Sequence, residues 1–362
     1  YDIPLLILRK EKKNYGTKQM IEGITDKTNK VILMGAIDLH VNCNHTSLTK
    51  ESVKHCLEHH DSTALIYDIS QNIYKPLKHL RPLRSGHTLS LLPNGNILVF
   101  GGVRAHVEHE LLKLNNPENY KNNKHLKYPI NYAQEYNPYT DTVFKKIPLP
   151  FKDYIVSHDI APLSGHEFLI VGGTISFKEI VTIPGTEQLG VKNYHHKNNK
   201  NIFVFDLNTG KLKTVGSVLY PRAGCKVLDI GHDEFLIVNG RWPDKLPFEQ
   251  AVEEIEIFNL NTGQSRLVGK LSGGNTRIHP ALLPDGRVLL VTGSKVAVFD
   301  PKTEQLTTVD ALIRPRDEFR LLKHSNDDIY IIGGHNRLGA EKLVERFDFE
   351  AFKQWESQTQ ER

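Results

Sequence analysis

The sequence predicts an all-β repeat protein, because two short patterns alternate along its 362 residues. The first is a hairpin: in residues 85–102, two apolar runs flank Pro93-Asn94-Gly95, and Gly101-Gly102 follow the second run. Asn-Gly supplies the positive φ angles that a tight hairpin turn requires. The second is an aromatic residue followed by Asp or Asn. Copies of the hairpin pattern occupy residues 20–36, 85–102, 157–173, 223–240, 277–293 and 319–334, and the aromatic pairs are 67–68, 136–137, 205–206, 258–259, 299–300 and 347–348.

Repetition of strand patterns every ~40 to 50 residues is typical of a β-propeller, whose four-stranded blades pack face to face. Six copies predict six blades of four antiparallel strands, named A to D in sequence order. In the second repeat they are expected at His87–Leu92, Asn96–Gly101, Asn131–Asn137 and Thr142–Ile147. No linker divides the repeats, so residues 1–362 are expected to form a single domain.

The last blade needs residues from the end of the sequence. Lys342–Asp348 and Phe352–Glu356 are expected to fill it, with Asp2–Leu8 nearby as an edge or latch strand. Gly-Gly is expected to end strand B in each repeat.

These patterns resemble kelch repeats. The resemblance rests on the Arg-x-x-His of residues 84–87, the Gly-Gly of residues 101–102 and the aromatic-Asp pairs. The stretch His87 to Gly102 is also similar to bacterial kelch proteins and to galactose-oxidase-like propellers. The resemblance covers nearly the whole sequence and implies a six-bladed kelch-type propeller, but it does not imply one function, because this fold hosts binding proteins and unrelated enzymes. The strand D tryptophan of many kelch repeats occurs here only as Trp355.

The composition indicates which cellular location and which classes of binding partner to expect. The net charge of +4 is too balanced to indicate nucleic acid, and no apolar run has the ~20 residues of a membrane helix. The sequence begins with Tyr1, which fits either a shortened form or a mature protein whose targeting segment has been removed, and its few Met and Cys residues fit a secreted or periplasmic protein. A monomer is expected. Cys43 and Cys56 are expected to form a disulfide, although three unpaired buried thiols, including Cys225, are the alternative.

Long B–C connections distinguish the first three repeats. More than thirty residues separate the end of strand B from the next aromatic in these repeats, against 18, 6 and 13 in the others. By parity of strand direction, the B–C and D–A connections reach the same edge of each sheet. Long loops on one side of a rigid scaffold commonly carry function, while drift of tolerated surface loops is the alternative. The Asn-rich segment of residues 191–201 suits a solvated loop.

One position before strand A is basic in several repeats, and three residues later there are two histidines. The kelch resemblance places this level at the mouth of the central channel. The predicted ligand-binding residues are Arg84, His87, His158, Arg222 and Arg316. Convergent guanidinium groups suit a carboxylate or phosphate. The alternative is a scaffold in which each arginine pairs with a carboxylate of a neighbouring blade.

No cofactor or metal is predicted. His55, His59 and His60 and the cluster of His106, Glu108, His109 and Glu110 lack a recognised ligand spacing. A galactose-oxidase-like copper centre is disfavoured, since no matching Tyr, His and Cys set is evident. We therefore expect a module that binds a protein partner, or an acidic small molecule or glycan, through the insertion-bearing face. The alternative is a carbohydrate-active enzyme resembling the six-bladed kelch mutarotases or epimerases that act on sialic acid.

Overall fold

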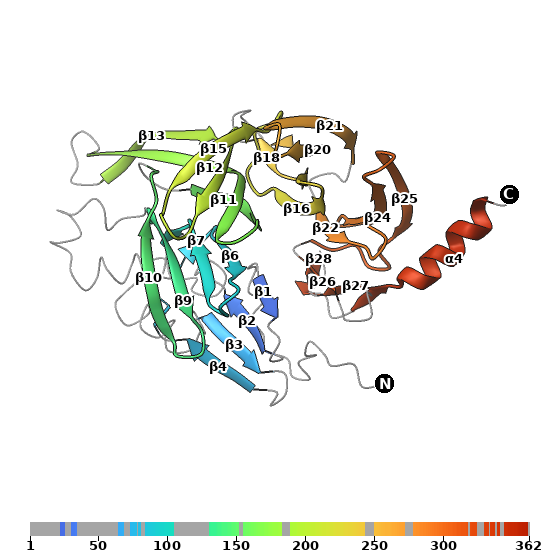
Figure 1. Ribbon diagram of the computed structural model, residues 1–362, viewed down its shortest axis with the longest axis horizontal. Helices are drawn as coiled ribbons and strands as arrows, with labels where there is room; N and C mark the ends of the chain where they lie inside the picture. Colours follow the sequence, from blue (N-terminus) through green and yellow to red (C-terminus); the bar gives the residue numbers. More distant parts are fainter. Residues whose placement is uncertain are drawn as a thin grey trace. The chain divides into compact units, whose positions relative to one another are not determined.

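The computed structural model describes much of the protein (Figure 1). The described residues are 22–25, 30–34, 64–68, 73–77, 79–80, 84–104, 130–151, 155–182, 189–242, 250–271, 278–317, 319–323, 329–332, 334–336, 339–340 and 344–360. The protein divides into two compact units, Tyr1–Lys197 with Val204–Lys213 and Asn198–Phe203 with Thr214–Arg362. The single domain expected from the sequence stays a prediction.

Two four-stranded antiparallel sheets come first, and both have the predicted neighbour order A, B, C, D. The first sheet consists of β1 (Glu22–Thr25), β2 (Lys30–Met34), β3 (Ala64–Asp68) and β4 (Ile73–Leu77). The second consists of β6 (Thr88–Leu91), β7 (Ile97–Phe100), β9 (Tyr132–Asn137) and β10 (Thr142–Pro148). The strands expected in the second repeat, and the weak hairpin copy at residues 20–36, are confirmed.

The third sheet departs from the expectation that Gly-Gly ends strand B. It consists of β11 (Ile155–Pro162), β12 (Glu167–Thr182), β14 (Asn201–Asp206) and β15 (Leu212–Ser217), and β13 (Leu189–Asn198) pairs with β12. Strand β12 continues through Gly172 and Gly173, because glycine at φ angles of 67° and 86° is tolerated within a strand that keeps a partner. Most of the Asn-rich segment expected to be a loop is thus strand β13.

The fourth and fifth sheets are again four-stranded with the order A, B, C, D. The fourth consists of β16 (Lys226–Gly231), β17 (Glu234–Val238), β20 (Glu254–Asn259) and β21 (Gln264–Lys270). The fifth consists of β22 (His279–Leu282), β23 (Val288–Val291), β24 (Lys295–Asp300) and β25 (Gln305–Ala311).

The sixth sheet has three described strands, and a helix follows where strand D was expected. The strands are β26 (Arg320–Lys323), β27 (Ile329–Ile332) and β30 (Glu345–Phe347), and the helix is α4 (Phe349–Gln360). The expectation that Phe352–Glu356 forms a strand is wrong, and Trp355 lies in the helix. Asp348 explains the change, because its Oδ1 accepts the N–H of Ala351 at 3.0 Å as an N-cap. The residues that follow contain neither Gly nor Pro, so nothing interrupts the helix.

Local hydrogen bonds shape the turns of these sheets. In the A–B turns of the second and fifth sheets, Gly95 N donates to Leu92 O and Gly286 N donates to Leu283 O. Both glycines have positive φ angles, 82° and 88°. In the C–D turns, the Asp or Asn after the aromatic accepts backbone N–H groups that follow it, as an Asx turn does. These residues are Asn137, Asp206, Asn259 and Asp300.

Strand B forms the core of each well-described sheet. All four residues of β7 and of β23 are buried, as expected for a strand covered on both faces. Within the first unit β6 lies against β1 and β11, and within the second β22 lies against β16 and β26. Backbone hydrogen bonds join neighbouring sheets near strand A, from Gly102 N to Ile155 O at 2.8 Å and from Arg316 N to Gly293 O at 2.8 Å.

The B–C and D–A connections meet at one edge of a sheet, as predicted. In the second repeat, β5 (Arg84–Ser85) enters strand A and pairs with β8 (Val103–Arg104), which begins the B–C connection. In the fourth repeat, Ala223 forms the equivalent bridge with Arg241 of β18 (Arg241–Trp242). Strand β18 pairs with β19 (Gln250–Ala251), and in the sixth repeat β28 (His335–Asn336) pairs with β29 (Gly339–Ala340).

Candidate functional site

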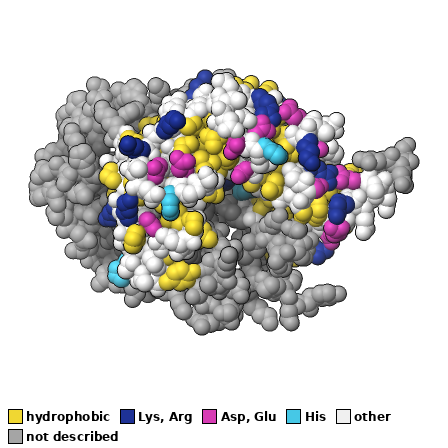
Figure 2. Space-filling view, in the orientation of Figure 1, with side chains coloured by type: hydrophobic (Ala, Val, Ile, Leu, Met, Phe, Trp, Pro, Cys, Tyr) yellow, Lys and Arg dark blue, Asp and Glu magenta, His cyan; other side chains and the backbone are white. Residues whose placement is uncertain are grey.

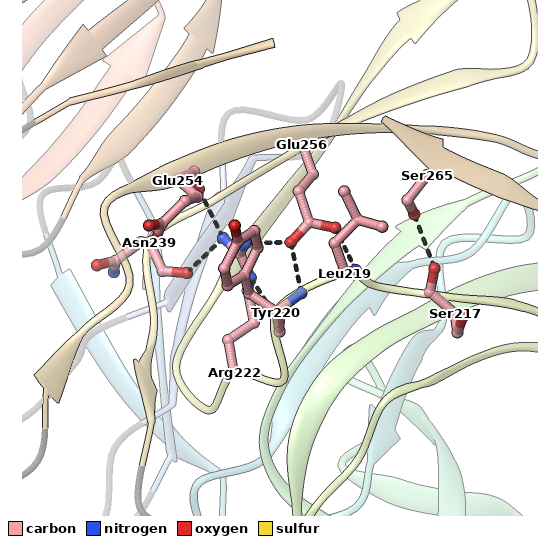
Figure 3. A network of polar contacts seen from close by, with 8 residues as sticks. All are labelled: Ser217, Leu219, Tyr220, Arg222, Asn239, Glu254, Glu256 and Ser265. Carbon is pink, nitrogen blue, oxygen red and sulfur yellow. Dashed lines mark hydrogen bonds and ion pairs between the residues drawn. The ribbon is translucent and has the colours of Figure 1, made fainter. Parts of the chain in front are cut away.

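Arg222 forms a clamp at the edge where the connections of the fourth sheet meet (Figure 3). Its Nη1 donates to Asn239 O at 3.1 Å, just after β17, and to Glu254 O at 3.0 Å, at the start of β20. These two carbonyls mark the two ends of the B–C connection. Its Nε donates to Tyr220 O at 3.2 Å, and its Nη2 donates to the Glu256 carboxylate. Arg222 therefore joins both ends of the B–C connection to the D–A connection.

Glu256 completes this clamp from strand C. Its Oε2 accepts the N–H of Leu219 at 2.7 Å, and its Oε1 accepts that of Tyr220 at 3.1 Å. The side chains of Arg222 and Glu256 are both 0 % exposed. A buried ion pair is tolerated when each partner also has other hydrogen bonds, which is the case here. In Figure 3 a further bond, from Ser265 Oγ to Ser217 O at 2.8 Å, lies beside this network.

The same clamp recurs in the sixth repeat. Arg316 is 2 % exposed, and its Nη2 donates to the carboxylate of Glu345 on β30. Its Nε donates to Arg314 O at 3.2 Å. Glu345 accepts the N–H of Ile313 at 2.8 Å and that of Arg314 at 3.3 Å. The two clamps match group by group on the D–A side.

The second repeat has the same clamp with an uncharged acceptor in place of the carboxylate. Arg84 is 2 % exposed and its Nη1 donates to Gly101 O at 2.8 Å and to Tyr132 O at 3.0 Å, again at the two ends of the B–C connection. Its Nη2 donates to the Gln134 amide oxygen, so an amide stands where the other clamps have a carboxylate. The guanidinium carbon lies 4.9 Å from the centre of the Tyr132 ring, within cation–π range.

The three acceptors were missed in the sequence. Gln134, Glu256 and Glu345 each stand two residues before the aromatic of strand C. In the third repeat the arginine position is Ile155 and the acceptor position is Phe203, and in the fifth the acceptor position is Ala297. Polar acceptors thus accompany arginine in alternate repeats. This pairing within one repeat is the signal that would have identified them.

The two predicted histidines have different surroundings. The Nδ1 atom of His87 is buried and has no hydrogen-bond partner. Burial, and then the charge of Arg84, lower the pKa of His87 from 6.5 to about 4. His158 is 4 % exposed, and its Nε2 lies 2.9 Å from Thr88 Oγ1 on the neighbouring sheet. Its ring meets Phe100 edge to face, with 5.3 Å between centres. His158 therefore packs the second sheet against the third.

These contacts bear on two expectations: that the arginines have donors not used by a protein carboxylate, and that any paired carboxylate lies in a neighbouring blade. An anion site requires guanidinium donors that no protein carboxylate uses, yet Glu256 and Glu345 accept from Arg222 and Arg316. The scaffold alternative placed each carboxylate in a neighbouring blade, whereas each lies on strand C of the same sheet. The reason is geometric: the start of strand C lies within hydrogen-bond distance of the arginine, since Arg222 Nη1 donates to Glu254 O at 3.0 Å and Arg84 Nη1 donates to Tyr132 O at 3.0 Å. Ligand binding by Arg84, His87, His158, Arg222 and Arg316 stays a prediction.

No protein-family model matches this sequence, and the search of curated proteins finds no match either. The kelch resemblance therefore rests on the internal repeats.

Several predicted residues lie outside the described part of the protein. They are Cys43, Cys56, His55, His59, His60, His106, Glu108, His109 and Glu110, and the edge strand expected at Asp2–Leu8 lies outside it as well. Within the described ranges, three or more His, Cys, Asp or Glu side chains nowhere gather as a metal site would require. No helix among the described residues has the length and apolar character to cross a bilayer. Cys225 is buried at the start of strand A.

Proposed function

We propose that the six sheets are the blades of a kelch-type propeller, and that the protein is a binding module for a protein or glycan partner. In this proposal the partner binds along the edge that carries the B–C connections. The repeated A, B, C, D sheets and the contacts between successive A strands within each unit support the architecture. A secreted or periplasmic location belongs to the same proposal.

The arginine clamp is the observation that carries the proposal. Arg222 holds the carbonyls at both ends of one B–C connection, and Arg84 does the same in the second repeat. A loop whose ends are already fixed loses less conformational entropy when it binds a partner. Buried arginines at these positions therefore suit connections that must keep their shape when a partner binds.

The lengths of the connections add support. The first three repeats have the long B–C connections, and in the third repeat this connection extends β12 to Thr182 and returns as β13. Regular structure in an insertion is better suited to presenting contacts than an irregular loop is. On the face drawn in Figure 2, described Lys and Arg side chains are interspersed with Asp and Glu. Such a surface favours recognition by particular contacts rather than by a field of one sign.

A photo-crosslinking comparison tests the proposed edge. A crosslinking amino acid is placed at Arg241, which is exposed within the B–C connection of the fourth repeat, or at Asn261, which is exposed in its C–D turn. Both variants are tested on the same panel of neutral and acidic glycans and of extracellular proteins. We expect adducts from position 241 and none from position 261. Equal yields from the two positions, or adducts only from position 261, would reject the hypothesis that the partner binds along this edge.

Ligand-observed NMR with sialic acid tests the enzyme alternative. The clamp geometry predicts no signal that depends on the arginines, because their donors already have protein acceptors. A sialic acid signal that disappears in a folded Arg222→Lys variant would replace the binding-module proposal with an acidic-sugar site.

A further inference from the structure

The Asn94-Gly95 pair in the A–B turn of the second sheet is a reactive sequence held in an unreactive geometry. Asn94 is exposed and is followed by glycine, which offers no side chain to shield the backbone nitrogen. The Asn94 Nδ2 donates to Glu135 Oε1 at 3.0 Å, and its Oδ1 accepts the N–H of Asn96 at 3.0 Å. The backbone N–H of Gly95 donates to Leu92 O at 2.9 Å. Both reacting groups are therefore engaged elsewhere.

The reaction in question is spontaneous deamidation. The backbone nitrogen of Gly95 attacks Cγ of Asn94, the new bond closes a succinimide ring, and the bond between Cγ and Nδ2 breaks. The proton lost by Gly95 N leaves with the amide nitrogen as ammonia. Water then opens the ring and leaves an aspartyl or isoaspartyl residue at position 94. No oxidant, metal or enzyme is needed, and asparagine is for this reason a thermolabile residue.

We propose that Asn94 is a modification site at which Glu135 suppresses deamidation in the folded sheet, and that the modified turn is less stable than the original. Glu135 is 6 % exposed on β9, and its Oε1 also accepts from Asn96 Nδ2 at 2.7 Å. To reach Gly95 N, the Asn94 side chain must leave Glu135 and the Gly95 N–H must leave Leu92. Both changes require the turn to open locally, so reaction is limited to the open state.

Deamidation is expected to destabilise the turn because Glu135 lies opposite position 94. An acid at position 94 places a second carboxylate within hydrogen-bond distance of Glu135, where an amide donor had been, and two carboxylates at this distance repel each other. The fifth repeat has an acid in the corresponding turn, with a cation beside it. There Asp285 precedes Gly286, and Arg287 Nε donates to Asp285 Oδ2 at 2.7 Å. The second repeat has Asn96 at the position of Arg287, and Glu135 on β9 lies within hydrogen-bond distance of Asn94.

Peptide mapping during incubation in mildly alkaline buffer tests the first half of the proposal. We expect position 94 to deamidate about tenfold or more slowly in the folded protein than in the same protein unfolded in urea, and Glu135→Ala to remove much of this protection. Glu234→Ala, which removes a carboxylate of the fourth sheet, is the control and should leave the rate unchanged. Equal rates for folded and unfolded protein, or an unchanged rate in Glu135→Ala, would overturn it.

A double-mutant comparison tests the second half and does not require ageing. Asn94→Asp is expected to lower the urea midpoint of unfolding, and adding Glu135→Gln is expected to restore much of the loss, because an amide can donate to the new carboxylate. Asn94→Ser controls for loss of the amide alone. A midpoint for Asn94→Asp equal to that of the wild type, or no recovery with Glu135→Gln, would contradict the proposed repulsion.

Discussion

The Arg222 guanidinium donates to the Glu256 carboxylate in a part of the fourth sheet where neither side chain is exposed. The two residues are 34 positions apart, one at the entry to strand A and the other on strand C. Their remaining polar atoms bond to backbone groups of both connections at this edge. The pair is therefore stable as a unit, but neither member is stable alone.

Removing one member of this pair tests how much the pair contributes to the stability of the protein. We expect Arg222→Ala to lower the free energy of unfolding by about 3–5 kcal/mol, because it leaves Glu256 buried without its cation. Arg266→Ala is the matched control, since Arg266 also pairs with a carboxylate of the fourth sheet, Glu234, but its side chain is 41 % exposed. It should cost about 1 kcal/mol or less. Urea unfolding of both variants makes the comparison, and equal losses would contradict the buried clamp.

Alanine substitutions at two glycines with similar backbone angles distinguish the cost of backbone strain from the cost of a steric clash. Gly101 (φ 65°) and Gly165 (φ 71°) both adopt the left-handed conformation, so alanine at either site costs about 1–2 kcal/mol. A Cβ on Gly101 would lie 2.6 Å from His158 Cε1 and 2.7 Å from Ile155 O, whereas a Cβ on Gly165 would meet nothing within 4 Å. We expect Gly101→Ala to lose about 1–3 kcal/mol more than Gly165→Ala in urea unfolding. Similar losses would show that the sheets do not pack this closely.

His87 makes stability depend on pH. Its pKa in the folded protein, about 4, lies below the ordinary 6.5, so between these values the unfolded protein binds a proton that the folded protein does not. The free energy of unfolding is fully retained above pH 6.5 and falls as the pH drops toward 4. At about 1.4 kcal/mol per pKa unit, protonation of His87 lowers the free energy of unfolding by about 3 kcal/mol once the pH is below its folded-state pKa of about 4.

A His87→Phe variant isolates this contribution, because the other histidines are unchanged. Urea unfolding at about pH 7 and about pH 4.5 should show a smaller drop in the variant than in the wild type. Identical pH profiles for the two proteins would show that His87 titrates normally in the folded state.

Helix α4 is expected to contribute to stability through Phe352. This side chain is 7 % exposed among Leu283, Leu289 and other apolar residues of the fifth and sixth sheets, and Arg287 lies 5.0 Å from its ring centre. Phe352→Ala should lower the free energy of unfolding by about 3–5 kcal/mol. Trp355→Ala, at a neighbouring aromatic that is 44 % exposed, should cost clearly less. A larger loss for Trp355→Ala than for Phe352→Ala in thermal or urea unfolding would show that the helix does not pack through Phe352.

The strands and turns of the second repeat were predictable because their causes are local. Alternation of apolar runs with Asn94-Gly95 defines the A–B hairpin, and Asn137 defines the C–D turn, through atoms only a few residues away. The sixth repeat shows the limit of this reasoning. Phe347-Asp348 has the same pattern, but the residues after it determine whether the Asp closes a turn or caps a helix, and here Asp348 caps α4.

The all-β class, the repeat boundaries and the positions of the three arginines follow from the sequence alone. The role of those arginines depends on the folded protein, because their acceptors Gln134, Glu256 and Glu345 lie about 30 to 50 residues away along the sequence. The hydrogen-bond partner of a side chain depends on which strands become neighbours when the sheet forms. Spacing along the sequence does not contain that information, and burial then makes the pairing obligatory, since a charge removed from water must be satisfied within the protein.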